Sequence, residues 1–214
     1  MSRLCCARCN RPLKACICQF IIAVDNDVHV VVLLHPKEVN QAKGTLPLLV
    51  NSLTNCTVIE GENFSDNKML IDLLSHYGDN VALLYPSDRA LLLKAVGDTP
   101  MGNDQPYNKI SKVKCIVLLD ATWKKAYRMY QLSTNLHQLK HFALPENLVG
   151  QYTIRKTKKE YALSTLEACC YALEIIEGNS KNKSGKYQLL INKFVEFNTF
   201  QLSFRPIIHS QNTQ

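Results

Sequence analysis

Short runs of aliphatic and β-branched residues alternate with amphipathic stretches along most of the chain, and this alternation constrains the fold more than any other feature. Such a pattern is typical of an α/β domain with a mostly parallel sheet, because each helix returns the chain to the edge where the next strand begins. Strands are predicted at residues 28–34, 81–85, 114–119 and 141–144. Helices are predicted at residues 41–53, 67–76, 122–132, 164–177 and 187–198.

The chain has 214 residues, enough for one domain of ordinary size with a small appendage. Three parts are predicted: a cysteine-rich segment at residues 1–20, the main α/β domain at residues 21–178, and a polar loop with a C-terminal extension at residues 179–214. Only Asn, Ser and Lys stand between Gly178 and Gly185, which marks the second boundary. Within the main domain, Ser164 followed by Glu167 predicts the N-terminal cap of a helix.

The composition is that of a globular protein, with 46% hydrophobic and 20% charged residues, and it excludes collagen-like and wholly disordered chains. The apolar runs are far shorter than the roughly 20 residues needed to span a bilayer, so no membrane span is expected. The first residues, Met-Ser-Arg-Leu-Cys-Cys, lack the apolar core of a signal peptide. We therefore expect a cytoplasmic protein whose thiols are reduced.

Positive charge is unevenly distributed along the chain. Residues 109–193 contain 15 basic and 6 acidic side chains, whereas residues 21–108 contain 5 basic and 11 acidic side chains. This asymmetry predicts one basic face, which favours a polyanionic partner. An ordinary solvated surface rich in lysine is the alternative for any single cluster.

Five of the nine cysteines lie within the first 18 residues. Cys6 and Cys9 form a C-x2-C pair, and Cys16 and Cys18 form a C-x-C pair after a short loop. Four thiolates at this spacing can surround a zinc ion, and such a closed set leaves no coordination position for a substrate. We predict a structural zinc site made by Cys6, Cys9, Cys16 and Cys18. Cys5 is the spare thiol, and it would replace Cys6 only if the first pair were C-x3-C.

Polar side chains follow three of the predicted strands. His35 and Glu38 follow the first, Ser87 follows the second, and Asp120 with Trp123 follows the third. Open α/β sheets bind ligands at the carboxyl ends of their strands, so these side chains are candidates for a functional site. A structural hydrogen bond is the alternative for His35, and a helix cap is the alternative for Glu38. No glycine-rich dinucleotide or P-loop motif follows any strand, which argues against both of those classes.

Asp120 is the candidate whose neighbours in the sequence indicate a function most clearly. An Asp between a strand and a helix often serves only as a helix cap, and that alternative is open here. The chain's only tryptophan, Trp123, follows three residues later, with Lys124, Lys125 and Arg128 on the same predicted helix. A carboxylate, a stacking ring and cations for phosphate are the side chains expected of an enzyme that acts on nucleic acid.

These segments resemble the DTW-domain family of tRNA-uridine aminocarboxypropyltransferases, which belongs to a SPOUT-related superfamily. The signature D-x-T-W is present at residues 120–123, and further family motifs follow the same order along nearly the whole chain. They are the cysteine knuckle at residues 6–18, H-P-x-E at 35–38, G-E-x-F-S at 61–65, L-[FY]-P-S at 84–87, Y-x-I-R-K at 152–156 and L-S-T-L-E-A at 163–168. One departure is the run at residues 42–46, Ala-Lys-Gly-Thr-Leu, where many members carry an Asn-Thr-Gly-Arg-like run.

The resemblance implies transfer of the 3-amino-3-carboxypropyl group of S-adenosylmethionine to N3 of a uridine in tRNA, with release of methylthioadenosine. It also implies a SPOUT-like knotted sheet, with residues 21–178 as the catalytic domain. Asp120 is then the candidate general base for the uracil proton. The expected cofactor-binding residues surround it: Pro86, Ser87, Leu119, Ala121, Thr122, Trp123, Leu144, Pro145, Ser164, Thr165 and Leu166.

The expected RNA-binding residues are Lys124, Lys125, Arg128, Arg155 and Lys156. For Arg155 and Lys156, the carboxylate of the cofactor is the alternative ligand. Trp123 would face either the adenine or the reactive uridine. Two other functions remain open: a SPOUT-like RNA methyltransferase, and a zinc-knuckle RNA-binding module without catalysis. The tRNA species, the position of the uridine and the oligomeric state also stay open, with a homodimer among the alternatives.

Overall fold

The computed structural model describes residues 4–9, 11–39, 41, 44–93, 112–145, 148, 163–178 and 185–204. Its centre is a six-stranded sheet in the order β2-β1-β5-β3-β6-β4, in which each neighbouring pair is parallel. The strands are β1 (His29–Leu34), β2 (Cys56–Glu60), β3 (Val81–Leu84), β4 (Leu91–Leu92), β5 (Cys115–Asp120) and β6 (Lys140–Ala143). The predicted α/β fold with a mostly parallel sheet is therefore confirmed.

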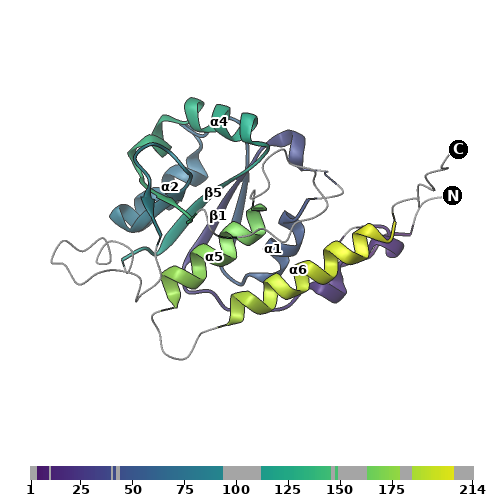
Figure 1. Ribbon diagram of the computed structural model, residues 1–214. Helices are drawn as coiled ribbons and strands as arrows, with labels where there is room; N and C mark the ends of the chain where they lie inside the picture. The colour runs from purple at the N-terminus through teal and green to yellow at the C-terminus, as the bar shows by residue number, and fades with distance from the viewer. Residues whose placement is uncertain are drawn as a thin grey trace, which may run out of the picture.

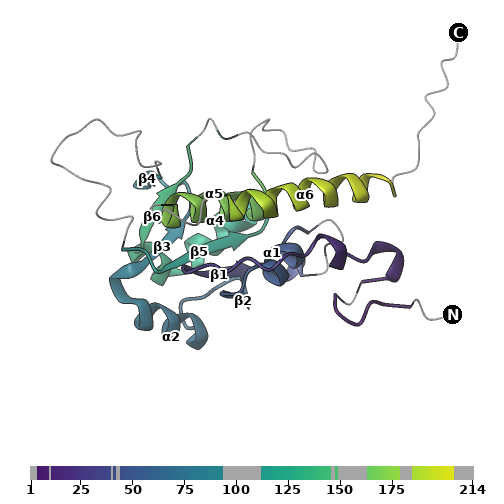
Figure 2. The same ribbon diagram turned by 90° about the horizontal axis from the view of Figure 1, so that it is seen from below.

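Helices cover both faces of the sheet (Figures 1 and 2). The α-helices are α1 (Leu46–Ser52), α2 (Lys68–Tyr77), α4 (Trp123–Leu132), α5 (Thr165–Glu177) and α6 (Lys186–Leu202). Short 3-10 helices are η1 (Leu13–Ala15), η2 (Cys18–Phe20), η3 (Pro36–Glu38), η4 (Gly78–Asn80) and η5 (Thr134–Gln138).

Strand β1 is buried on both sides, as a central parallel strand must be. Val30 and Val32 belong to the core shared with α1, α5 and α6. Val31 and Leu33 belong to a second core, shared with α2, α4 and η5. The alternation of neighbouring side chains along one strand thus builds two apolar layers around the sheet.

The four predicted strands agree with β1, β3, β5 and β6 to within one or two residues, and the five predicted helices are all present. Helix α1 begins at Leu46 rather than at residue 41, because Thr45 is its N-cap and Pro47 lies in its first turn. Gln41 and Gly44 are not helical, and residues 42 and 43 lie outside the described residues. Helix α6 continues to Leu202, past the predicted end at residue 198.

The N-terminal segment packs against α6 (Figure 1). The ring of Phe20 lies with its centroid 5.7 Å from that of Phe197 and 5.3 Å from that of Phe200. The guanidinium of Arg11 lies 5.9 Å from the Phe197 ring centroid. Phe194 and Phe197 are buried in the core that α5 also lines, so α6 connects the cysteine-rich segment to the sheet domain. The predicted division into three parts stays a prediction.

Two further expectations concern the whole chain. Among the described residues, no helix is both long enough and apolar enough to cross a bilayer. The predicted knot depends on the path between β6 and α5, where residues 146, 147 and 149–162 lie outside the described residues. The knot therefore stays a prediction.

Candidate active site

The carboxyl ends of β1 and β5 form the point of the sheet where ligands of open α/β folds usually bind. These two strands are neighbours. The chain leaves these two strands in opposite directions: from β1 it continues to β2 on one side of the sheet, and from β5 it continues to β6 on the other side. Since all the strands are parallel, the residues that follow β1, β3, β5 and β6 emerge at the same edge.

Asp120 is the last residue of β5, and its side chain is held by α5. The Oγ1 hydroxyl of Thr165 donates a hydrogen bond of 2.6 Å to Oδ1 of Asp120. The backbone amide of His35 donates to the Asp120 carbonyl at 3.2 Å. The N-cap of α4 is Thr122, whose side chain makes no capping hydrogen bond. The N-cap position of α4 is thus Thr122, two residues after Asp120.

The first turn of α5 places Thr165 against Asp120. Ser164 is the N-cap, and its hydroxyl accepts a 3.2 Å hydrogen bond from the amide of Glu167. The Ser164 amide in turn donates to Oε2 of Glu167 at 2.8 Å. The predicted cap is confirmed as a complete capping box, and Glu167 is fully buried within it. This box fixes the start of α5 and so fixes the Thr165 hydroxyl.

Two carboxylates lie beside the basic residues of α4. The Lys125 ammonium lies 2.7 Å from Oε1 of Glu38, whose side chain is 7% exposed. Nε of Arg128 lies 2.8 Å from Oε1 of Glu62, and both of these side chains are exposed. Exposed ion pairs of this kind contribute at most about 1 kcal/mol, so an anionic ligand can replace Glu62 at Arg128 more easily than Glu38 at Lys125.

His35, the residue that follows β1, lies beside the carboxylate of Glu62. Its Nδ1 accepts a 3.1 Å hydrogen bond from the amide of Lys37, which makes His35 the N-cap of η3. A neutral ring that accepts at Nδ1 carries its proton on Nε2. That nitrogen lies 3.5 Å from Oε1 of Glu62. His35 thus positions both the loop after β1 and the carboxylate of Glu62.

Ser87 lies at the same edge, after β3. Its hydroxyl lies 2.6 Å from Nδ1 of His141, a buried residue of β6. Burial lowers the pKa of His141 below its usual value of 6.5. The ring is therefore neutral at neutral pH, and its hydrogen bond fixes the Ser87 hydroxyl.

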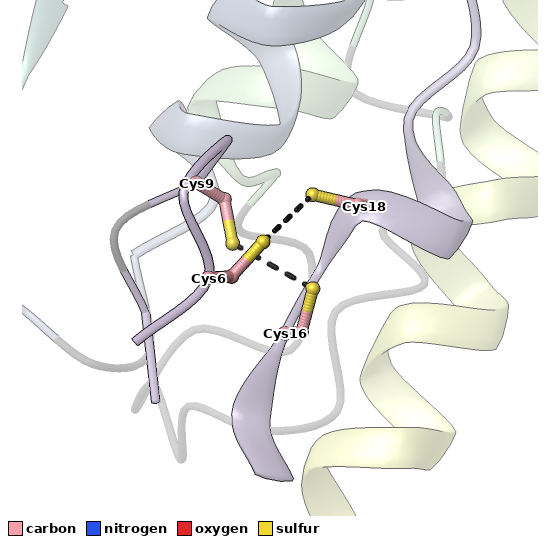
Figure 3. Close-up of side chains that lie close together, drawn as sticks. All are labelled: Cys6, Cys9, Cys16 and Cys18. Atoms are coloured by element: carbon pink, nitrogen blue, oxygen red, sulfur yellow. Dashed lines mark hydrogen bonds between the residues drawn. The ribbon is translucent and has the colours of Figure 1, made fainter. Parts of the chain in front are cut away.

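The four predicted zinc ligands lie together in the N-terminal segment (Figure 3). The sulfur atoms of Cys6, Cys9, Cys16 and Cys18 are all within 4.8 Å of one another. The Cys6 and Cys18 sulfurs are 3.6 Å apart, and the Cys9 and Cys16 sulfurs are 3.8 Å apart. Tetrahedral zinc with Zn–S bonds of about 2.3 Å requires sulfur separations of about 3.8 Å. The four side chains therefore fit a metal ion, and Cys5 lies outside the cluster.

The pKa values of the thiols in this cluster are shifted in opposite directions. Hydrogen bonds from the backbone amides of Cys9 and Arg8 lower the pKa of Cys6 to about 6. Desolvation and the neighbouring thiols raise the pKa of Cys18 to about 12. Amides that donate to sulfur stabilise a thiolate, whereas four adjacent thiolates repel one another. A divalent cation would stabilise all four thiolates.

A family model for the DTW domain matches residues 3–202 of the chain. The chain belongs to the DTW domain family. Curated relatives named tRNA-uridine aminocarboxypropyltransferase 2 are 30% identical over 182 residues in Macaca fascicularis and 31% identical over 177 residues in Drosophila melanogaster. These alignments cover 82% and 80% of this chain, and 57% and 66% of the respective relatives. The chain thus spans little more than half the length of the first relative, and no solved structure matches it.

The DTW signature occupies the end of β5 and the start of α4 in this member of the family. Trp123, the first residue of α4, is 56% exposed. Ala121 and Leu119 are partly buried beside Asp120, and Leu166 is buried in α5. The other residues predicted to bind the cofactor lie at the same edge: Pro86 and Ser87 follow β3, Leu144 and Pro145 follow β6, and Thr122, Ser164 and Thr165 lie at the two helix starts. Arg155 and Lys156 lie outside the described residues.

Sequence reasoning assigned no role to two residues of this edge. Glu62 belongs to the quoted G-E-x-F-S motif, but its partners His35 and Arg128 come from other segments of the chain. Tyr127 is an exposed aromatic residue of α4. A helical projection of residues 123–132 would have placed it one turn after Trp123, on the same side of the helix.

Proposed function

We propose that the chain transfers the 3-amino-3-carboxypropyl group of S-adenosylmethionine to N3 of a uridine in tRNA and releases methylthioadenosine. Membership of the DTW family and the names of the curated relatives support this proposal. The observation that carries it in this chain is the Asp120 carboxylate, held by Thr165 at the carboxyl edge of the sheet. S-adenosylmethionine, when bound, supplies an activated carbon next to a sulfonium leaving group.

Asp120 is the proposed general base. Uracil N3 carries a proton and is a weak nucleophile at neutral pH, so a carboxylate that accepts this proton assists its attack. The new bond joins N3 to the γ-carbon of the methionine portion, and the bond from that carbon to sulfur breaks. The electron pair of the broken bond stays on sulfur, and methylthioadenosine leaves. Thr165 holds the carboxylate in place during this step.

The cofactor pocket is proposed at the edge formed by the segments after β3, β5 and β6 and by the first turn of α5. A helix start carries a partial positive charge, which suits a carboxylate such as that of the methionine portion. The orientation of the substrate decides which of the three carbons on sulfur is transferred. The proposed pocket residues are Pro86, Ser87, Leu119, Ala121, Thr122, Leu144, Pro145, Ser164, Thr165 and Leu166, whereas the exposed ring of Trp123 is assigned to the RNA.

The proposed tRNA contacts are Lys124, Lys125, Arg128, Arg155 and Lys156. Lys125 and Arg128 already pair with carboxylates, so they would also position Glu38 and Glu62. The metal proposed for the four-cysteine cluster is zinc, in a structural role. Four protein ligands complete a tetrahedral site, and the cluster packs against α6 through Phe20.

Product analysis separates this function from its alternatives. The chain is incubated with S-adenosylmethionine and tRNA, and the small-molecule products are separated. Methylthioadenosine supports the proposed transfer, whereas S-adenosylhomocysteine identifies a methyltransferase. An RNA-binding module without catalysis yields neither product.

A further inference from the structure

Helix α4 exposes two large aromatic rings on one side. Trp123 is 56% exposed and Tyr127 is 59% exposed, and they are four residues apart. Residues at this spacing are neighbours on a helix surface, about 6 Å apart along its axis. Within the part of the chain that the structure describes, neither ring packs against another aromatic ring. Most large aromatic side chains of a folded domain are buried, so two such neighbours at the surface indicate a binding function.

A row of cations runs beside the two rings. Lys124 follows Trp123 in the sequence, and Arg128 follows Tyr127. The two cations are therefore also four residues apart, and both are exposed. Among the described residues, Lys124 makes no ion pair, and Arg128 pairs only with the exposed Glu62. Helix α4 begins two residues after β5 ends at Asp120 and lies in the outer layer of the molecule (Figure 1). The two rows therefore start beside the candidate base.

We propose that this face of α4 binds an unpaired stretch of RNA, with successive bases stacked on Trp123 and Tyr127 and the adjoining phosphates bound by Lys124 and Arg128. A single strand presents bases on one side and phosphates on the other, as the two rows require. This inference rests on the proposed function for the identity of the partner. It adds a site for the nucleotides that flank the reactive uridine.

Other partners fit the two rows less well. A protein partner would find charged side chains beside the rings, whereas the centres of protein interfaces are depleted of lysine. A membrane surface would require a longer apolar face than two rings. Aromatic rings flanked by cations are typical of proteins that hold single-stranded nucleic acid without reading its sequence.

Trp123 is the only tryptophan of the chain, so its fluorescence reports on the site directly. The full chain is titrated with an oligouridylate of about eight nucleotides, and separately with a ribose-phosphate oligomer of the same length that lacks bases. Both carry the same charge. We expect the oligouridylate to quench the fluorescence and to bind more tightly, since base stacking contributes in addition to the phosphate contacts.

Variants at Tyr127 test the second ring. Tyr127→Ala should weaken binding of the oligouridylate on the order of tenfold, whereas Tyr127→Phe, which keeps the ring, should bind as the unaltered chain does. Leu189→Ala is the matched control, because Leu189 is equally exposed, at 59%, but lies on α6. It should leave binding unchanged. The exposure of Tyr127 means that none of these changes removes core packing.

The stacking site is contradicted if the chain binds the two oligomers equally well. It is also contradicted if Tyr127→Ala and Tyr127→Phe bind oligouridylate equally well. Transfer to tRNA is measured on the same preparations. A chain that transfers the group but binds both oligomers alike contradicts the stacking site alone. A chain that is quenched by oligouridylate but transfers nothing contradicts the proposed function alone.

Discussion

Oγ1 of Thr165 lies 2.6 Å from Oδ1 of Asp120, and this hydrogen bond joins the end of β5 to the first turn of α5. The two residues are 45 positions apart in the sequence. Asp120 lies in the D-x-T-W segment and Thr165 lies in the L-S-T-L-E-A segment. If Asp120 is the general base that we propose, this bond gives the L-S-T-L-E-A segment a part in holding it.

Thr165→Val tests this relationship. It removes the hydroxyl at nearly constant volume, so the Asp120 carboxylate loses the partner that orients it and favours its charged form. We expect a lower rate of transfer, with the acid limb of the pH–rate profile displaced to higher pH. Thr165→Ser keeps the hydroxyl and should restore both the rate and the profile. A Thr165→Val enzyme with an unchanged profile would show that the bond has no role in the reaction.

The metal site gives a second prediction. About one zinc ion per chain is expected, and Cys6→Ser should remove it because it takes one of the four clustered sulfurs. Cys5→Ser should retain the zinc, since Cys5 lies outside the cluster. Elemental analysis of the purified variants decides between them. Equal loss of zinc from both would show that the first ligand pair is wrong.

The cations of α4 should differ in their effects. Lys124→Gln removes one exposed charge, so binding of tRNA should become less dependent on salt without a change in stability. Lys125→Gln removes the ion pair with Glu38, so the free energy of unfolding should fall by about 1 kcal/mol. Salt titrations of tRNA binding and urea unfolding of the two variants measure these effects. If Lys124→Gln lowered the stability and Lys125→Gln did not, the stabilising role of the Lys125–Glu38 ion pair would be contradicted.

Stability should fall as the pH drops below about 6.5. Burial lowers the pKa of both His29 and His141 in the folded chain. Between the folded value and the usual value of about 6.5, the unfolded chain binds more protons, so acid favours unfolding and stability rises with pH through this window. Thermal unfolding of the unaltered chain and of His141→Asn between about pH 5 and 7.5 measures the effect. A pH dependence as steep in the variant as in the unaltered chain would exclude His141 as a contributor.

The sequence predicts those parts of this fold that depend on local pattern. The apolar run of β1 is buried on both faces, so it is visible in the sequence as a continuous hydrophobic segment. The capping box at Ser164 and the four clustered cysteines likewise follow from residues close together in the chain.

The hydrophobic pattern of the sequence does not predict two of the strands, and it does not predict the ion pairs. Strand β2 is a partly exposed edge strand, and β4 has two residues, so neither shows a clear hydrophobic run. The Lys125–Glu38 pair joins residues 87 positions apart, which only the order of the strands brings together. Tertiary packing therefore decides which carboxylates pair with the cations of α4, and the sequence alone left the role of Asp120 divided between cap and base.

The most direct test of the proposed chemistry compares the unaltered chain with Asp120→Asn. Each is incubated with S-adenosylmethionine and tRNA, and the tRNA nucleosides are identified by mass spectrometry over time. We expect the unaltered chain to form 3-(3-amino-3-carboxypropyl)uridine, and Asp120→Asn to form it about 10²- to 10⁴-fold more slowly while it binds both substrates normally. Formation of the product by Asp120→Asn at the rate of the unaltered chain would contradict the account.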